Sequence, residues 1–266
     1  QFISLGDNNL EKIKGLFHSI NLQNSSLIVH VGDIIPGGSP CEESQIEIQR
    51  ELMNNLNASV LYTPGDNEWR DCIDNDTGDS NSLERLTYIR ESYFSNGKTL
   101  GRNPSIVENQ RERGYPENAR LMIKNIAFIS AHVIGDGNNY DFYGKKNTLE
   151  YLKRDKANID WIKKSFERYK DASAYVVAIH ADILTASGFL IYENFTNSLL
   201  ELSNKYQKPV LLLNGNDHRF RAYKPFTNKF PFLHVIQNFG HPDKKAIEIE
   251  INPSKKIPFN VTKIIE

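Results

Sequence analysis

The chain has 266 residues and a mass of 30.5 kDa, which is enough for one large domain with a sizeable buried core. Its 32 Lys and Arg residues balance 33 Asp and Glu residues, and no block of like charge occurs, so we do not expect nucleic acid as a partner. The longest apolar runs, such as residues 174–179, fall far short of the roughly 20 residues that span a bilayer, so we expect no membrane span.

Short apolar runs alternate with polar turns and amphipathic stretches along most of the chain. After the first run, Leu10, Ile13, Leu16, Phe17 and Ile20 fall on one face of a helix. In chain order, strands are expected over residues 2–5, 27–31, 59–63, 120–123, 126–131, 174–179 and 210–213, and helices over 42–56, 148–169 and 194–206. This alternation predicts an α/β fold.

Two regions depart from the alternation. Residues 69–118 are rich in Asn, Arg and Glu and show one helical patch, and a long loop in a compact domain is often a lid. The final strands, at residues 233–237, 246–251 and 261–264, are typical of a mostly antiparallel arrangement. We therefore expect a single domain over residues 1–266 with a lid-like insertion over 69–118.

Five of the expected strands end in a residue that can bind a metal ion. These residues are Asp7, Asp33, Asp66, His180 and His218. Each Asp follows a Gly, which lets the backbone turn sharply and approach an ion closely. A single Asp after a strand is usually a turn residue or a helix N-cap. Because ligands in α/β sheets gather beyond the carboxyl ends of the strands, five such residues favour one shared metal site.

Carboxylate and imidazole ligands together favour Mn, Fe or Zn over Ca. Two ions that share one bridging carboxylate would activate a hydroxide and neutralise the oxygens of a phosphoryl group. This chemistry needs no nucleophilic side chain.

Five sequence blocks, in order, resemble those of calcineurin-like metallophosphoesterases over nearly the whole chain. The blocks are Gly6-Asp7, Gly32-Asp33, Gly65-Asp66-Asn67-Glu68, His180 and Gly215-Asn216-Asp217-His218. Residues 63–69, with the loop at 37–41, are more specifically similar to a little-characterised bacterial branch. The resemblance implies a four-layer αββα sandwich of two mixed sheets flanked by helices, with a dinuclear centre. It also implies that Asp33 bridges two ions, that Asp7 and His218 bind one, and that Asp66 and His180 bind the other.

Asparagine occupies three positions where the family usually has histidine: Asn9, Asn67 and Asn216. An amide cannot act as a general acid, so we expect Asn67 to orient a phosphoryl oxygen instead. Asn216 could still offer its carbonyl oxygen to a metal, although more weakly than an imidazole. His132, which follows the strand at 126–131, could reach the site as a substitute acid; the alternative is a hydrogen-bonded loop histidine.

The expected function is that of a metal-dependent hydrolase of phosphoric esters, acting on a phosphorylated small molecule or another phosphoester. Without the usual acid, it should prefer substrates with good leaving groups. The alternative is a degenerate metal-binding or interaction protein that keeps the fold and has little catalysis.

The two cysteines, Cys41 and Cys72, each lie in a polar, loop-like stretch, and we expect a disulfide between them. The sequence opens on a strand-like run without Met, as a mature protein does after removal of a signal peptide, although trimming gives the same start. We therefore expect an exported protein, either periplasmic or secreted.

Overall fold

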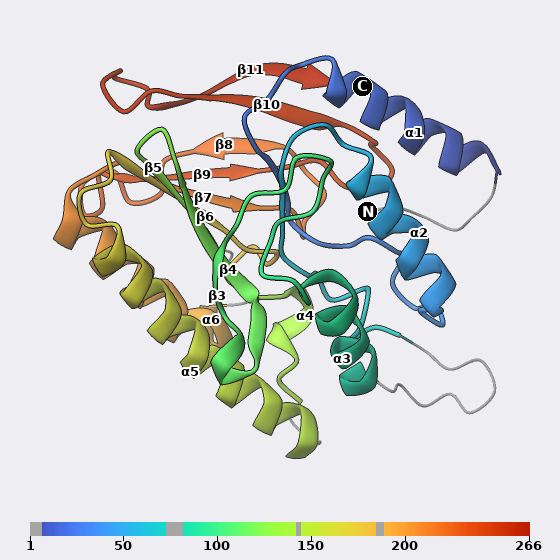
Figure 1. Ribbon diagram of the computed structural model, residues 1–266. Coiled ribbons are helices and arrows are strands. Elements are labelled where there is room, and N and C mark those ends of the chain that lie inside the picture. The colour runs from blue at the N-terminus through green and yellow to red at the C-terminus, as the bar shows by residue number, and fades with distance from the viewer. Residues whose placement is uncertain (1–6, 73–81, 142–144, 185–188) are drawn as a thin grey trace.

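The computed structural model describes residues 7–72, 82–141, 145–184 and 189–266, apart from the side chains of residues 7–9, 145 and 189. Within these ranges the chain forms one mixed sheet of seven strands, two sheets of two strands each, and surrounding helices (Figure 1). The predicted α/β class is confirmed. In place of two large mixed sheets, the described residues form one. The strand expected at residues 2–5 lies outside them.

The large sheet carries four parallel strands in its middle. In spatial order its strands are β3 (Glu108–Gln110), β4 (Tyr115–Ile123), β5 (Ile126–Ser130), β6 (Ala174–Ala178), β7 (Val210–Asn214), β9 (Leu233–Gln237) and β8 (Arg221–Tyr223). Strands β5, β6, β7 and β9 are parallel, and β3, β4 and β8 pair antiparallel with their neighbours. Every residue of β5, β6 and β9 is buried, as expected for strands covered on both faces. Among the late strands, β9 pairs parallel with β7 and antiparallel with β8, so the expected antiparallel arrangement holds for it on one side only.

The two small sheets pack on one face of the large sheet. They are β1 (Ile28–His30) with β2 (Val60–Tyr62), which are parallel, and β10 (Ala246–Ile251) with β11 (Phe259–Ile265), which are antiparallel. One apolar cluster joins Leu61 and Phe259 of the small sheets to Val176 and Leu211 of the large one. Figure 1 shows β10 and β11 lying above β8 and β9.

Helices cover the two outer faces of this arrangement. On the large sheet, Phe166 of α5 (Lys145–Arg168) and Phe195 of α6 (Phe189–Tyr206) pack against Tyr175 and Val177 of β6. Around β1 and β2 lie α1 (Asp7–Asn21), α2 (Glu43–Asn54) and α3 (Ser82–Tyr93). Two short helices complete the set, η1 (Arg111–Arg113) and α4 (Gly135–Asn138). Over the described residues, no helix is both long and apolar enough to cross a bilayer.

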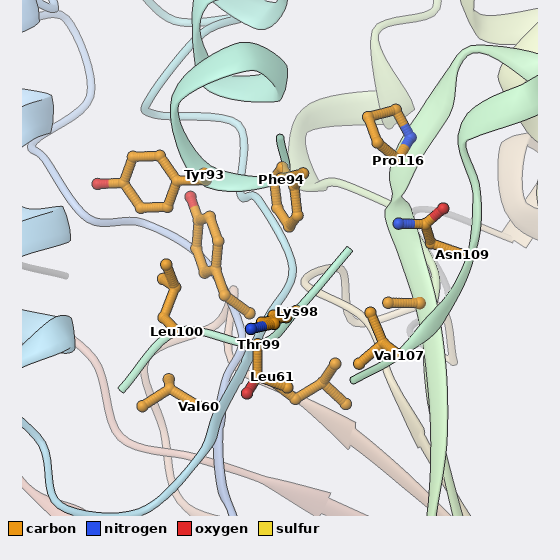
Figure 2. A pocket seen from close by; sticks show the side chains of 12 residues that line it. Val60, Leu61, Tyr93, Phe94, Lys98, Thr99, Leu100, Val107, Asn109 and Pro116 are labelled. Atoms are coloured by element: carbon orange, nitrogen blue, oxygen red, sulfur yellow. The ribbon is translucent and has the colours of Figure 1, made fainter. Parts of the chain in front are cut away.

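Residues 69–118 contain more regular structure than their composition predicts. They include α3, β3, η1 and the first part of β4. After α3 the chain passes alongside β2, where Val60 and Leu100 exchange backbone hydrogen bonds of 2.8 and 3.0 Å. Figure 2 shows Phe94, Leu100 and Val107 arranged around Val60 and Leu61. The described part of residues 69–118 is packed on the core, and a role of the segment as a lid remains a prediction.

Candidate metal centre

Three predicted ligands, Asp33, Asp66 and His180, meet beyond the carboxyl ends of three strands. They follow β1, β2 and β6 by only a few residues, so the ends of these parallel strands bring them together. One ligand atom from each lies within 4.8 Å of the other two, and all three side chains are buried. The predicted convergence is thus matched by these three, and His218 joins them through Asp33, whose Oδ2 lies 3.8 Å from its Nε2.

The imidazole of His180 is oriented by the backbone. Its Nδ1 lies 2.6 Å from the carbonyl oxygen of Val31, which accepts the Nδ1 proton and leaves Nε2 facing the cluster. Around Nε2 are Oδ1 of Asp66 at 2.7 Å, Oδ1 of Asn216 at 3.0 Å and Oδ1 of Asp33 at 3.4 Å. A histidine held through one nitrogen while the other faces oxygen ligands is the usual arrangement at a metal.

The buried carboxylates create a strong preference for positive charge. Burial alone would lower the pKa of His180, but the carboxylates of Asp33 and Asp66 outweigh it and raise that pKa to about 10. Burial would likewise raise the pKa of Asp33, yet the nearby imidazoles of His180 and His218 lower it to about 2. The same field that holds a proton on Nε2 would hold a cation in its place.

Asp33 lies between two groups of side chains. Its Oδ1 faces Nε2 of His180, and its Oδ2 lies 3.8 Å from Nε2 of His218. Both Asp33 and His218 have left-handed backbone conformations, with φ of 59° and 60°. Non-glycine residues in this region store strain, and such strain is often found at functional sites.

Two glycines allow the backbone to approach the cluster closely. A Cβ atom on Gly65 would lie 2.3 Å from Oδ1 of Asp33, and one on Gly135 would lie 2.0 Å from Oδ1 of Asn216 and 2.9 Å from Oδ1 of Asp66. Any side chain at either position would displace a candidate ligand. The sequence singled out Gly65, and the packing adds Gly135.

Glu68, to which no role was assigned from the sequence, organises the site. Its buried carboxylate accepts hydrogen bonds from the backbone N–H of Asp33 at 3.1 Å and of Gly65 at 2.7 Å, and from the hydroxyl of Tyr62 at 2.6 Å. Glu68 therefore ties together the two turns that carry Asp33 and Asp66. In the sequence, the indication of this role was the position of Glu68 directly after Asp66-Asn67.

Asn67 is buried beside the disulfide. Its Oδ1 lies close to Gly37, its Nδ2 has no hydrogen-bond partner among the described residues, and its backbone N–H donates to Oδ1 of Asp33 at 3.4 Å. Cys41 and Cys72 form the expected disulfide, and both sulfurs lie near the carbonyl oxygen of Asn67, at 3.4 and 3.8 Å. A role for Asn67 toward a phosphoryl group remains a prediction.

His132 is fully buried in a separate network. Its Nδ1 lies 2.9 Å from Oε1 of Glu117, which also pairs with Arg90, and its ring lies 5.5 Å from that of Trp69. Burial lowers the pKa of His132 to about 4, so it is neutral near pH 7. These contacts match the hydrogen-bonded alternative, and a catalytic role for His132 stays untested.

A second acidic group adjoins the first and includes Asp66. Carboxylate oxygens of Asp66, Asp71 and Asp136 lie within 4.8 Å of one another. Arg70 already occupies this group, because its Nη1 lies 2.6 Å from Oδ1 of Asp71 and 3.1 Å from Oδ2 of Asp136. Arg70 serves as the cation there, and we do not regard the group as a second metal site. Arg70 is another residue that the sequence analysis missed.

The residues present fit a metal ion. The donor set combines carboxylate, imidazole and amide groups, as Mn, Fe and Zn accept. Apart from its charged contact with His180, Oδ1 of Asp66 is buried without a hydrogen-bond partner in the part of the chain that the structure describes. Asp7 begins α1, but its side chain, like that of Asn9, lies outside the described residues.

Comparison with known proteins supports the fold. No family model matches the sequence, and no curated protein matches it. Among solved structures, a dimetal phosphatase from Danio rerio matches with a TM-score of 0.56 over 88% of this chain and 78% of that chain, at 10% sequence identity. The resemblance to calcineurin-like metallophosphoesterases is therefore confirmed at the level of the fold.

Proposed function

We propose that this protein is a metal-dependent hydrolase of phosphoric esters. The observation that carries the proposal is the contact of Asp33, Asp66 and His180 at the strand ends of a metallophosphatase-like fold. The substrate would be a phosphorylated small molecule or another phosphoester. Two ions, Mn, Fe or Zn, would supply Lewis acidity and lower the pKa of bound water.

The proposed metal ligands would lie on two sides of Asp33. We propose that Asp33 bridges the two positions, because its oxygens face different histidines. Asp66, His180 and Asn216 would hold the ion on one side, and Asp7 and His218 the ion on the other. Glu68 would keep the turns that carry Asp33 and Asp66 in register through its backbone hydrogen bonds.

Several finer proposals accompany this function. The two small sheets would act as a second β layer, giving the four-layer αββα sandwich that the resemblance implies. Parts of residues 69–118 would cover the site as a lid. The disulfide Cys41–Cys72 supports export to an oxidising compartment, either the periplasm or the exterior.

Hydrolysis assays with added Mn²⁺ test the proposal. The wild type should turn over aryl phosphoesters, and Asp33→Asn should lose at least about 100-fold in kcat/KM because the bridging charge is gone. Since the usual acid is replaced by Asn67, alkyl esters should react more slowly by about 100-fold or more. Asp160→Asn, on the exposed side of α5, is the matched control.

The alternative is a degenerate metal-binding or interaction protein with the same fold. The burial of Asn67, where the family usually has histidine, favours this alternative. Metal binding without turnover of either ester class, with Asp33→Asn indistinguishable from wild type in the assay, would select it and reject the hydrolase.

A further inference from the structure

Arg70 lies at the rim of the candidate metal centre with only part of its guanidinium engaged. It follows Asp66 by one helical turn, and its backbone N–H donates to the carbonyl oxygen of Asp66 at 2.8 Å. Its side chain is 33% exposed, whereas Asp33, Asp66 and His180 are buried. Arg70 is therefore a partly exposed cation in the same turn as a residue of the buried cluster.

Two carboxylates hold one nitrogen of this guanidinium. Asp71 and Asp136 both contact Nη1, at 2.6 and 3.1 Å. Among the described residues, no hydrogen bond engages Nε or Nη2 of Arg70. The Nε and Nη2 edge can therefore donate two parallel hydrogen bonds, the geometry in which arginine binds phosphate oxygens.

The acidic group that holds Arg70 also includes Asp66. Oxygens of Asp66, Asp71 and Asp136 lie within 4.8 Å of one another, so the two carboxylates that hold Nη1 lie beside Asp66, whose carboxylate also contacts His180. Gly135, which precedes Asp136, packs directly on Asp66 and Asn216. A ligand that touches the Asp66 side of the centre would thus lie near the acidic group that holds Arg70.

We propose that Arg70 binds the phosphoryl group of the substrate through its Nε and Nη2 edge, and that the preferred substrate is a phosphomonoester. This inference rests on the proposed hydrolase function. A monoester presents three terminal oxygens, so two can accept from Arg70 while one remains for the metal side. A diester has only two terminal oxygens, so it cannot offer two oxygens to Arg70 and a third to the metal side.

A structural role for Arg70, as a clamp between Asp71 and Asp136, makes a different prediction. Arg70→Lys separates the two roles, because one ammonium group can pair with both carboxylates but has no second edge for a phosphate. Arg70→Gln removes both functions and serves as the second variant.

Calorimetric titration of the Mn²⁺-loaded full chain with inorganic phosphate tests the proposal, with metal content and melting temperature measured on the same samples. Arg70→Lys should keep both its metal and its melting temperature while its phosphate Kd rises about 10- to 100-fold, the range expected for lost charge-assisted hydrogen bonds. Its preference for an aryl monoester over the matching diester should shrink by a similar factor. Arg168→Gln is the control, because Arg168 is an ion-paired arginine at the end of α5 that precedes β6, opposite the end that carries His180.

Each other outcome has a defined meaning. An unchanged phosphate Kd in Arg70→Lys and Arg70→Gln, with wild-type binding intact, would overturn the role of Arg70 and leave the hydrolase standing. If the variants lose phosphate binding only when they also lose metal and thermal stability, Arg70 acts as a structural clamp between Asp71 and Asp136. This result would also overturn the proposed role of Arg70 in phosphate binding. If the loaded wild type binds no phosphate and hydrolyses no ester, the proposed function fails and this inference fails with it.

Discussion

Glu68 is the residue on which the geometry of the centre depends most directly. Its carboxylate accepts from the N–H groups of Asp33 and Gly65, and Glu68→Gln would place an NH₂ group opposite one of these donors. We expect this variant to lose about 10-fold or more in Mn²⁺ affinity and about 1–3 kcal/mol of stability. Metal titration calorimetry and urea unfolding measure the two effects.

Glu250→Gln is the control for this substitution, because Glu250 pairs with Lys255 at the surface. An unchanged Mn²⁺ Kd in Glu68→Gln would contradict the positioning role of Glu68.

His132 predicts how stability varies with pH. Its pKa is lowered from 6.5 to about 4 in the folded protein, mainly by burial, so the unfolded chain binds its proton first as the pH falls. Stability from this residue is complete above pH 6.5 and declines toward about pH 4, by at most about 3 kcal/mol. In His132→Gln, urea unfolding should show a shallower decline than the wild type over this window. Equal slopes would contradict the burial of a neutral imidazole.

Some individual site residues could be predicted from the sequence and others could not. Asp33, Asp66 and His180 were predictable because each directly follows a strand, and strand ends converge. Glu68 and Arg70 were not, because their roles depend on which way side chains point from the turn after Asp66. That direction is set by hydrogen bonds to residues of other elements, such as Tyr62 of β2 and Asp136 of α4.

At the scale of elements, the disulfide fixes the turn after β2 to the loop before α2. It closes 31 residues between Cys41 and Cys72, and Gly38 adds a backbone hydrogen bond to Asp71 at 3.1 Å. Replacing both cysteines with serine should cost about 3–4 kcal/mol on chain-entropy grounds. It should also weaken metal binding, since Asp66 lies in the same turn. Thermal unfolding and Mn²⁺ titration check both effects.

Reductant provides an independent check of this prediction, because the chain has only two cysteines. Treated wild type should match the double variant. A melting temperature that neither treatment changes would contradict the argument.

Elements with clear periodicity were predictable, and elements defined by long-range pairing were not. The buried runs of β5, β6 and β7 and the amphipathic face of α1 were apparent from apolar spacing alone. The direction of β9 could not be predicted. β8 lies between β7 and β9 in the sequence, but in the sheet β9 lies between β7 and β8, and β8 forms the edge. Within residues 69–118, Leu100 pairs with Val60 of β2 and β3 pairs with β4, and composition reveals neither pairing.

At the scale of the whole molecule, the arrangement of layers places the centre. The parallel strands of the large sheet and of β1–β2 both direct polar residues to their carboxyl ends. The interlayer apolar cluster holds the two sets of strands together, so His180 from one sheet meets Asp33 and Asp66 from the other. The fold can match that of a dimetal phosphatase at 10% identity, because the pattern of buried residues that sets a fold can persist while most residues change.

Metal content per chain shows whether Asp33, Asp66 and His180 form a metal centre. It would be measured for wild type and Asp33→Asn after equilibration with Mn²⁺ and removal of free ions. We expect about two ions per chain in the wild type and a loss of most of this metal in Asp33→Asn, because both sides of the centre would use that carboxylate. Equal metal content in the two proteins, or none in either, would contradict a metal centre at Asp33, Asp66 and His180.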